Sequence, residues 1–250
     1  MERSLKTPEV HNVLVTGGAS GMGRSAALRL AADGKQVVVA DLNLQAARET
    51  VEQIAEFGGR SRALQVDVAQ EDSVNALYRS LEAEPLDMLV HAAGILGETA
   101  FVEAADFEDW KRVLAVNLDG AFLCARGAVR MMQCGQGGRI TLFSSVAGLQ
   151  PSPGAAAYST AKGGVISLAR TLASEGARHN IRVNVIAPGY IETPMLNGLP
   201  EGFADHVRKK TPLKRLGEMD EVSALVAFLA SAGADFFTGQ VLSPNGGLVM

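Results

Sequence analysis

The chain has 250 residues, of which 47% are hydrophobic and 20% are charged, the balance of an ordinary soluble globular protein. A net charge of −4 and a pI near 5.6 argue against nucleic acid or an anionic membrane as the main partner. No apolar run is long enough to cross a bilayer, and residues 1–12 lack the apolar segment of a signal peptide, so we expect a cytoplasmic protein.

The two cysteines of the sequence are Cys124 and Cys134. If both lie on the apolar helix expected around residues 121–132 and its extension, a rise of about 1.5 Å per residue keeps them too far apart for a disulfide. Neither stands at ligand spacing from a histidine or a second cysteine. We therefore expect structural thiols in a reducing compartment and no metal site.

Short β-branched runs alternate with longer amphipathic stretches along the whole chain, with no linker or repeat. The predicted strands cover residues 12–15, 36–40, 62–65, 88–91, 139–143, 182–186 and 241–243. The predicted helices cover residues 23–32, 45–57, 71–82, 107–132, 155–179 and 219–229. Several strands are continuous apolar runs, which suits strands covered on both faces. The alternation predicts an α/β fold, a doubly wound parallel sheet of about seven strands, in a single domain over residues 1–250.

A glycine-rich turn joins the first predicted strand to the first predicted helix, with the sequence Thr16-Gly17-Gly18-Ala19-Ser20-Gly21-Met22-Gly23. Free backbone N–H groups and the helix dipole at such an N-terminus bind a dinucleotide pyrophosphate. Gly17 and Gly21 let the backbone approach the phosphates, and Gly23 lets the helix pack closely on the sheet. The alternative is a glycine-rich turn without a ligand, which the position between strand and helix disfavours.

Tyr158 and Lys162 stand four residues apart in a predicted helix and so share one face. An ammonium beside a phenol favours the phenolate, so we expect Lys162 to lower the pKa of Tyr158 from about 10 towards neutrality, with help from a cofactor or another charge. Such a phenol can take a proton from an alcohol without a metal or a histidine. On their own, the two residues more often indicate a half-buried aromatic beside a solvated cation.

Other motifs accompany these in a fixed order: His91-Ala92-Ala93-Gly94, Asn117, Ser144-Ser145 and Pro188-Gly189. Together with the Gly-x-x-x-Gly-x-Gly spacing and Tyr158-x-x-x-Lys162, they occur in the order and at the distances of the short-chain dehydrogenase/reductase family. The chain resembles that family from residue 13 to residue 247. The resemblance implies a Rossmann fold, a nicotinamide cofactor and oxidoreductase activity.

The resemblance also assigns catalytic roles. Tyr158 would be the acid–base, Lys162 the cation that lowers its pKa and binds ribose, and Ser145 the hydrogen-bond partner of the substrate oxygen. Asn117 would bend its helix and hold a water that relays protons from Lys162. Outside that context, Ser145 is a strand-end hydroxyl satisfying a turn, like Ser144, and Asn117 a buried, satisfied amide.

Asp41 stands at the end of the second predicted strand, where an acidic residue binds the adenosine ribose diol and repels a 2′-phosphate. NADP-using relatives often carry an arginine in the glycine loop or just after this strand, where this chain has Ser20 and Leu42. Both positions favour NAD, although Asp41 is alternatively a helix or turn cap. The predicted cofactor-binding residues are Gly17, Ser20, Gly21, Met22, Gly23, Asp41, Leu42, Asp67, Val68, Ala92, Gly94, Tyr158, Lys162, Pro188, Gly189, Ile191 and Thr193.

Some of these positions carry individual expectations. Asp67 and Val68 resemble the family pair that contacts adenine, although an aspartate ending a strand is also an ordinary turn residue. His91 and Ala92 replace the paired asparagines of many relatives, and we interpret His91 as a core or supporting residue rather than a catalyst. In relatives, the backbone at Ile191 and the hydroxyl at Thr193 hold the nicotinamide carboxamide.

Residues 194–212 are predicted to form a mobile lid over the substrate, with glycine hinges and an apolar inner face. The residues behind this prediction are Met195, Leu196, Gly198, Leu199, Gly202 and Phe203. With Leu96, Leu149 and Pro151 near the expected site mouth, the lid favours a small hydrophobic secondary alcohol or ketone.

Two alternatives remain open. Residues 239–247 resemble 3-oxoacyl carrier-protein reductases, which would make the substrate a 3-oxoacyl thioester of a carrier protein or CoA. Those enzymes often have basic residues near the positions of Gln136 and His179, which are not fixed cations. The second alternative is a redox sensor that binds NAD without turnover, which the retention of Ser145, Tyr158 and Lys162 disfavours.

Relatives are mostly two-fold symmetric tetramers that pair the helices predicted around residues 109–132 and 155–179 together with the last strand. The apolar tail at residues 248–250 suits burial in such an interface. We therefore expect a homotetramer.

Overall fold

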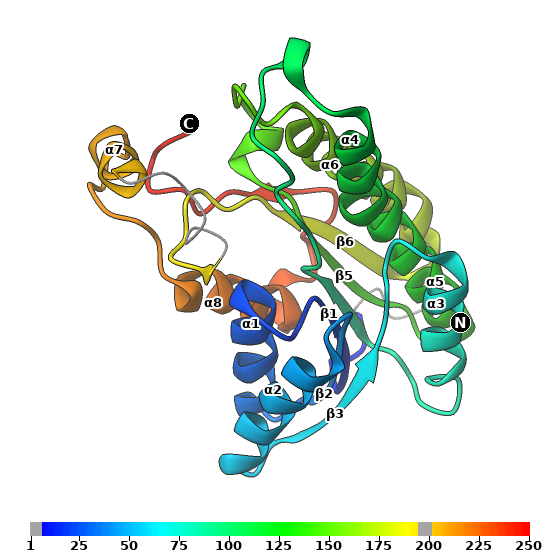
Figure 1. Cartoon of the computed structure of the whole chain (residues 1–250). Coiled ribbons are helices and arrows are strands. Elements are labelled where there is room, and N and C mark those ends of the chain that lie inside the picture. Colours follow the sequence, from blue (N-terminus) through cyan, green and yellow to red (C-terminus); the bar gives the residue numbers. More distant parts are fainter. Residues whose placement is uncertain (1–6, 195–201) are drawn as a thin grey trace.

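Seven parallel strands form one continuous sheet in the part of the chain that the computed structural model describes, residues 7–194 and 202–250 (Figure 1). The strands are β1 (Asn12–Thr16), β2 (Gln36–Asp41), β3 (Arg60–Gln65), β4 (Met88–His91), β5 (Gly138–Phe143), β6 (Ile181–Ile186) and β7 (Val241–Leu242). Their order is β3-β2-β1-β4-β5-β6-β7. The predicted doubly wound Rossmann sheet is confirmed, and its order reverses between β1 and β4, where ligands of such sheets bind.

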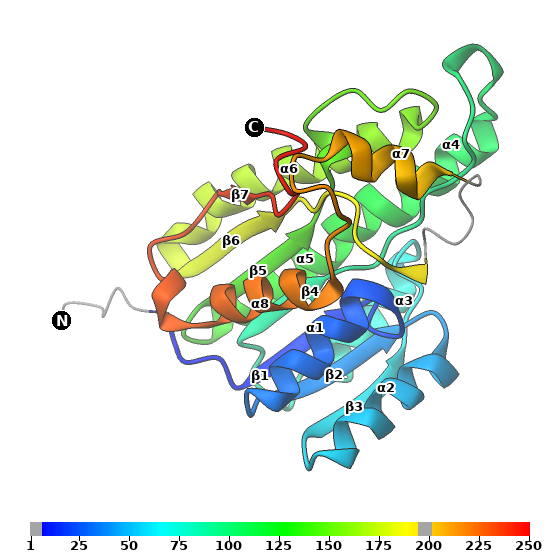
Figure 2. The same ribbon diagram turned by 90° about the vertical axis from the view of Figure 1, so that its left-hand side faces the viewer.

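Helices cover both faces of this sheet (Figures 1 and 2). On one face lie α1 (Gly21–Ala32), α2 (Leu44–Glu56) and α8 (Met219–Ala230). On the other lie α3 (Glu71–Arg79), α4 (Phe107–Leu114), α5 (Gly120–Cys134) and α6 (Ala156–Gly176). In the view of Figure 1, α7 (Phe203–Lys210) stands beside the C-terminal segment, apart from both layers.

Each face of the sheet has its own hydrophobic core. Along β1, Leu14 belongs to the core under α5 and α6, whereas Val13 and Val15 belong to the core under α1 and α8. Successive strand side chains point to opposite faces, so a strand covered on both sides is apolar throughout. All residues of β4 and β5 are buried, which accounts for the continuous apolar runs in the sequence.

Several predicted elements have different bounds in the structure, and three of the differences have a physical reason. The predicted helix 107–132 consists of α4, the π-helical segment η2 (Ala115–Asp119) and α5. The predicted helix 71–82 ends at Arg79, because the Ser80 hydroxyl donates to the Leu77 carbonyl at 2.6 Å and satisfies the end of the helix. Strand β3 begins at Arg60 rather than at residue 62, since an edge strand pairs on one side only and tolerates polar side chains.

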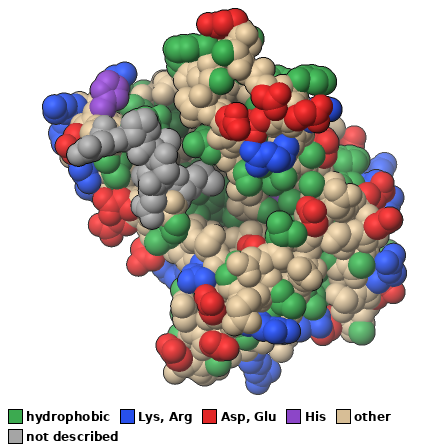
Figure 3. All heavy atoms as spheres, viewed as in Figure 1, with side chains coloured by type: hydrophobic (Ala, Val, Ile, Leu, Met, Phe, Trp, Pro, Cys, Tyr) green, Lys and Arg blue, Asp and Glu red, His purple; other side chains and the backbone are tan. Residues whose placement is uncertain are grey.

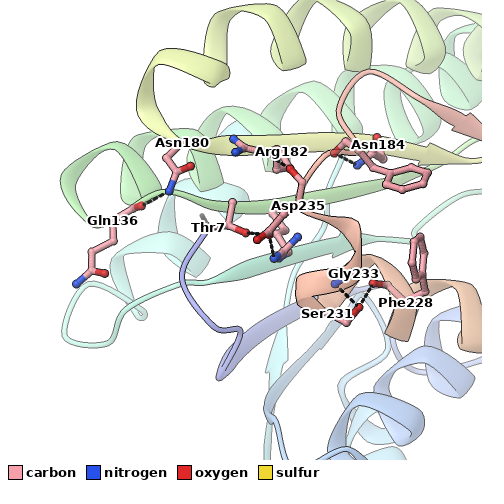
Figure 4. Close-up of polar contacts among 11 residues, drawn as sticks. Thr7, Gln136, Asn180, Arg182, Asn184, Phe228, Ser231, Gly233 and Asp235 are labelled. Atoms are coloured by element: carbon pink, nitrogen blue, oxygen red, sulfur yellow. Dashed lines mark hydrogen bonds and ion pairs between the residues drawn. The ribbon is translucent and has the colours of Figure 1, made fainter. Parts of the chain in front are cut away.

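A polar network ties the chain together at the amino ends of β5 and β6 (Figure 4). The Asp235 carboxylate accepts from the Thr7 hydroxyl and from the buried Arg139 guanidinium, the latter at 2.5 Å. Arg182 on β6 donates to the Asp235 carbonyl at 2.8 Å, and Asn184 donates to the Phe237 carbonyl at 2.9 Å. One loop therefore fixes the N-terminal segment against two central strands.

No helix within the described ranges has the length and apolar character needed to span a membrane. Cys124, which is buried, and Cys134, which is exposed, both lie on α5 as free thiols. The predicted helix 155–179 comprises α6 and the 3₁₀ turn η4 (Ala177–His179).

Candidate active site

The predicted site residues follow the carboxyl ends of four neighbouring strands. The glycine loop follows β1, Gly94 follows β4, Ser145 follows β5 and Pro188 follows β6. Parallel strands bring these ends to one edge of the sheet. In the space-filling view the molecule is hollowed between the α4–α6 side and the α1–α2 side, with hydrophobic side chains in the hollow (Figure 3).

The turn between β1 and α1 is held by close backbone contacts. Gly17 has a φ of +73°, and its N–H donates to the Ala40 carbonyl at 2.9 Å. A Cβ added to Gly23 would lie 2.1 Å from the Gly17 carbonyl oxygen, so only glycine fits there. Through this glycine α1 packs closely on its own loop and next on Ala92, the residue directly after β4.

The space in front of this turn is open. A Cβ added to Gly21 would meet no atom within 4 Å, although its φ of +52° favours glycine. Ser20, exposed at the N-cap of α1, makes no side-chain cap, and the first turn of α1 holds no acidic residue. An uncapped helix N-terminus beneath open space has the features of a pyrophosphate site, so the turn fits a dinucleotide.

Asp41 anchors the glycine loop and the start of α2. Its carboxylate oxygens accept from the backbone N–H groups of Ala19 and Asn43, each at 3.0 Å. The predicted alternative of a turn cap is therefore realised, but a carboxylate keeps further lone pairs for a ribose hydroxyl. Neighbouring Ser20 and Leu42 are exposed and uncharged, so neither position offers a cation to a 2′-phosphate.

Asp67 and Val68 form the turn after β3. The Asp67 carboxylate accepts from the Ala69 N–H at 3.0 Å, which is the ordinary turn role considered above. Val68 is buried, and a Cβ on Gly120 at the start of α5 would lie 2.9 Å from its side chain. The two residues fix the turn against α5 and leave Asp67 partly exposed at the site edge.

Asn117 lies in the π-helical segment η2 and clamps the segment after β4. Its amide NH₂ donates to the carbonyls of Val113 and Ile95, both at 2.9 Å, and its oxygen accepts from the Ile95 N–H at 3.2 Å. A Cβ on Gly94 would lie 2.5 Å from that oxygen. The buried amide is thus satisfied, and the π-helical turn is the distortion that presents it to Gly94.

The two serines after β5 have different surroundings. Ser144 is buried and donates to the Lys162 backbone carbonyl at 2.8 Å, so it fixes α6 to the sheet. Ser145 is partly exposed, accepts from the Ala147 N–H at 3.2 Å and also hydrogen-bonds the Tyr158 hydroxyl. Only Ser145 shares a hydroxyl pair with Tyr158, which agrees with its choice over Ser144.

Tyr158 and Lys162 share one face of α6, with the Lys162 ammonium 5.7 Å from the centre of the Tyr158 ring. Burial raises the pKa of Tyr158, and the hydrogen bond with Ser145 opposes this only in part. Burial lowers the pKa of Lys162 to about 8. The expected lowering of the Tyr158 pKa is therefore not found in the chain without a cofactor, because burial of the phenol outweighs the hydrogen bond that opposes it.

His91, the last residue of β4, is 1% exposed. Its Nδ1 lies 2.8 Å from the Thr16 hydroxyl at the end of β1. Burial, and next the charge of Lys162, lower the pKa of His91 to about 3, so the ring is neutral. The interpretation of His91 as a core or supporting residue agrees with this environment.

The segment after β6 lies against the C-terminal turn. The Val146 N–H donates to the Pro188 carbonyl at 3.0 Å, and a Cβ on Gly189 would lie 2.8 Å from the Asn245 backbone. Ile191 is buried and pairs with Gly217 through an isolated bridge, and Thr193 is partly exposed. Close packing holds this segment beside Ser145.

Sequence reasoning gave no role to Tyr190, which the structure puts at the site edge. Its ring meets Phe203 of α7 edge-on at 5.5 Å, and it helps to line a cavity of about 220 Å³ with Thr211, Arg215 and Asn245. An aromatic directly after Pro188-Gly189 was the available signal. Of the predicted lid, Met195, Gly198 and the two leucines between residues 195 and 201 lie outside the described residues, whereas Phe203 begins α7.

A larger hollow of about 1010 Å³ lies at the opposite edge of the sheet, between the end of α3 and the end of α5. It contains none of the predicted site residues. We therefore take the candidate site from the converging strand ends and not from cavity size.

Three comparisons with known proteins give a consistent result. Residues 17–249 match the family model described as enoyl-(acyl carrier protein) reductase. The chain is 38% identical over 248 residues to a (3R)-3-hydroxyacyl-CoA dehydrogenase of Mus musculus, covering 95% of each chain. It is 39% identical over 241 residues to a 3-oxoacyl-[acyl-carrier-protein] reductase of Synechocystis sp., covering 95% and 96%. It superposes on a short-chain type dehydrogenase/reductase from Mycobacterium marinum with a TM-score of 0.92 at 32% identity, over 96% and 95% of the chains.

Proposed function

The chain belongs to the short-chain dehydrogenase/reductase family of oxidoreductases, and we propose that it transfers a hydride between NAD and a secondary alcohol or the corresponding ketone. The observation that carries this proposal is a connected group of side chains at the edge that the glycine loop also borders. Asn117 and Lys162 lie against Gly94, the Lys162 ammonium lies 5.7 Å from the centre of the Tyr158 ring, and Tyr158 pairs with Ser145. A nicotinamide bound there supplies the hydride or accepts it.

In this mechanism the protein binds, orients and moves a proton. The N-terminus of α1 and Gly17 would hold the pyrophosphate, and Asp41 the adenosine ribose. Ser145 and Tyr158 would donate to the substrate oxygen from two directions, which fixes the reacting carbon and stabilises charge on that oxygen. Tyr158 would give its proton to the oxygen in reduction and remove one in oxidation.

The raised pKa of Tyr158 bears on this role. In the chain alone, burial disfavours the charged form of both Tyr158 and Lys162. A neutral phenol is a ready proton donor for ketone reduction. For alcohol oxidation the phenolate needs additional positive charge, which the oxidised nicotinamide ring carries. The two directions therefore place opposite demands on one hydroxyl.

The preference for NAD is supported by charge. Asp41 places a carboxylate beside the glycine loop, and the neighbouring Ser20 and Leu42 are neutral. A 2′-phosphate in that position would face a negative charge without a compensating arginine.

A second substrate class is favoured by the relatives named above, which act on 3-hydroxyacyl-CoA and 3-oxoacyl-[acyl-carrier-protein]. A 3-oxoacyl thioester contains a ketone that the same residues would reduce. Near His179 the chain does have a cation: the exposed Arg178, with Nε 3.0 Å from His179 Nε2. This cation supports the hypothesis of a carrier-protein substrate. Residues 136 and 179 by themselves disfavour that hypothesis.

The deciding experiment is a substrate panel with NAD and NADP side by side, containing cyclic and linear secondary alcohols, their ketones, and 3-oxoacyl-CoA. We expect turnover with NAD, and a loss of about 10²–10⁴-fold in kcat for Tyr158→Phe on the best substrate. Tyr78→Phe is the matched control, since that buried tyrosine bonds the Cys124 carbonyl on α5, away from the site.

Near-normal turnover by Tyr158→Phe would contradict the acid–base role. Tight NAD binding with no turnover of any substrate would favour the non-catalytic sensor instead.

Two further proposals concern the surroundings of the site. We propose that α7, held by the Tyr190–Phe203 contact, covers the substrate as the described part of the lid expected at residues 194–212. We also propose a single-domain protomer that assembles as a homotetramer through α4, α5, α6 and the last strand, β7. Sedimentation at micromolar concentration tests the assembly, and a monomer there would contradict it.

A further inference from the structure

His91 lies closer to the proposed proton path than the sequence indicated. In the sheet it pairs with Thr16 of β1 and with Leu142 of β5. Leu89, two residues earlier, belongs to the core under α5 and α6, so the His91 side chain points to that same face. Lys162 approaches the sheet from this side, on α6.

Two contacts put the Lys162 ammonium next to His91. The ammonium donates to the carbonyl of Phe143, the residue directly after the strand partner of His91, at 2.9 Å. A Cβ on Gly94, three residues beyond His91, would lie 3.2 Å from the same nitrogen. Neighbouring strands are about 4.8 Å apart, so both contacts hold the ammonium near the strand end that carries the imidazole, and the charge of Lys162 acts on the His91 ring.

The hydrogen bonding of the His91 ring is incomplete. Nδ1 has the Thr16 hydroxyl, but Nε2 is fully buried and has no partner among the described residues. A buried polar atom without a partner is uncommon in folded proteins and calls for a reason. Because the ring is neutral, one of its nitrogens carries the proton and the other a lone pair.

We propose that His91 is a positioning residue for Lys162: Nδ1–H donates to Thr16, and the lone pair on Nε2 faces the Lys162 side and favours the ammonium form. This inference rests on the proposed role of Lys162 as the cation beside Tyr158. It gives the orphaned nitrogen a function, since a buried ammonium next to a neutral acceptor loses less solvation than one next to a hydrocarbon.

The other groups around Lys162 are nearly all neutral. Tyr158 on the same helix is the second titratable neighbour, with a raised pKa that keeps it uncharged. The π-helical segment contributes the Asn117 amide, and β5 contributes the Phe143 carbonyl. Among the contacts described, no carboxylate stabilises the ammonium. The dipole of the neutral His91 ring can therefore affect the pKa of Lys162.

The first test is the tautomer of His91 in the cofactor-free protein, read from the ring ¹⁵N chemical shifts. The chain has four histidines, and His91→Asn assigns the signal. We expect the proton on Nδ1. A proton on Nε2 would overturn the proposal, because that atom could then offer Lys162 no lone pair.

The second test follows the pKa of Lys162 by ¹³Cε NMR, also without cofactor. We expect His91→Phe to lower it by about one unit, and His91→Asn, whose amide oxygen keeps an acceptor, to stay near wild type. Thr16→Val should also lower the pKa of Lys162, because without the hydroxyl the His91 proton is no longer held on Nδ1. Thr16→Ser retains the hydroxyl and should leave the pKa of Lys162 unchanged. Circular dichroism identifies which variants fold.

An unchanged Lys162 pKa in folded His91→Phe or Thr16→Val would contradict the positioning role and leave His91 with a packing role only. Should His91→Phe not fold, the Thr16 pair decides the matter. In the active enzyme, the alkaline limb of the pH–rate profile should move to lower pH by the same amount as the Lys162 pKa. The NMR results do not depend on turnover, so failure of the proposed activity is distinguishable from failure of this inference.

Discussion

Lys162 has a side chain that is only 4% exposed, and burial sets its chemistry more than its neighbours do. Its pKa of about 8 lies below the ordinary value of 10.5. A folded-state pKa below the unfolded one means that the unfolded chain binds more protons between these two values. Stability from this residue therefore rises as the pH rises through that window.

This predicts the pH dependence of Lys162→Met. In the cofactor-free protein, the variant should be more stable than wild type near pH 7, because it removes a buried charge. From about pH 7 to about pH 9.5 this difference in unfolding free energy should shrink by about 2 kcal/mol, because the wild-type lysine becomes deprotonated. Urea unfolding of both proteins at the two pH values measures it. An advantage independent of pH would show that the lysine is not destabilised by burial.

Asp41 is the residue that separates the two nicotinamide dinucleotides in our proposal. Asp41→Asn removes the charge but keeps one side-chain oxygen, so the loop loses at most one of its two backbone bonds. We expect the ratio of Kd for NADP to Kd for NAD to fall about tenfold, equivalent to about 1.4 kcal/mol. The ratio is informative because both dinucleotides share the pyrophosphate site and respond alike to loop disturbance. Asp33→Asn on the exposed end of α1 is the control, and an equal ratio in all three proteins would refute the assignment.

At the scale of elements, the β1–α1 unit and the π-helical segment η2 have different structural roles at the candidate site. The first brings a helix N-terminus to an open space, and the second presents the Asn117 amide to the segment that follows β4. Both depend on backbone geometry that a regular helix or strand does not supply.

Gly23→Ala tests the β1–α1 unit. Its Cβ would overlap the Gly17 carbonyl at 2.1 Å, so α1 must move away from the loop. We expect a loss of about 2–3 kcal/mol in unfolding free energy and weaker dinucleotide binding. Gly163→Ala in α6 is the matched control, since its Cβ would have its nearest neighbour at 3.8 Å and should be neutral or stabilising by up to about 1 kcal/mol. Equal effects of the two changes would contradict the close packing of α1 on its loop.

At the scale of the whole molecule, the loop around Asp235 joins parts of the chain that are far apart in sequence. Thr7, Arg139 on β5 and Arg182 on β6 all bond to this one residue (Figure 4). Arg139 is 4% exposed, so its charge depends on the Asp235 carboxylate for compensation.

Asp235→Ala should therefore destabilise the protein by about 3 kcal/mol, since it leaves a buried guanidinium uncompensated. Asp33→Ala, which breaks the exposed pair with Arg29, should lose less than about 0.5 kcal/mol. Chemical denaturation of both variants gives the comparison, and similar small losses would mean that water reaches Arg139.

Much of the fold and part of the site could be predicted from local patterns. Apolar runs of the β4 and β5 kind mark strands covered on both sides, and the glycine spacing after β1 marks a turn that only glycine can make. The four-residue spacing of Tyr158 and Lys162 likewise predicted that the two side chains share one face of a helix. These features depend on residues close in sequence, and their geometry is fixed by backbone sterics and side-chain period.

The pKa values of the site residues and their long-range side-chain contacts were decided by the tertiary structure alone. The pKa of Tyr158 and that of Lys162 depend on how deeply the two side chains are buried, which no spacing reveals, and burial raises the first and lowers the second. The Thr16–His91 bond and the Tyr190–Phe203 contact join residues brought together only by folding. Local sequence thus determined the elements and the order of the motifs, whereas desolvation and long-range packing, which sum over the whole chain, set the charge states within the site.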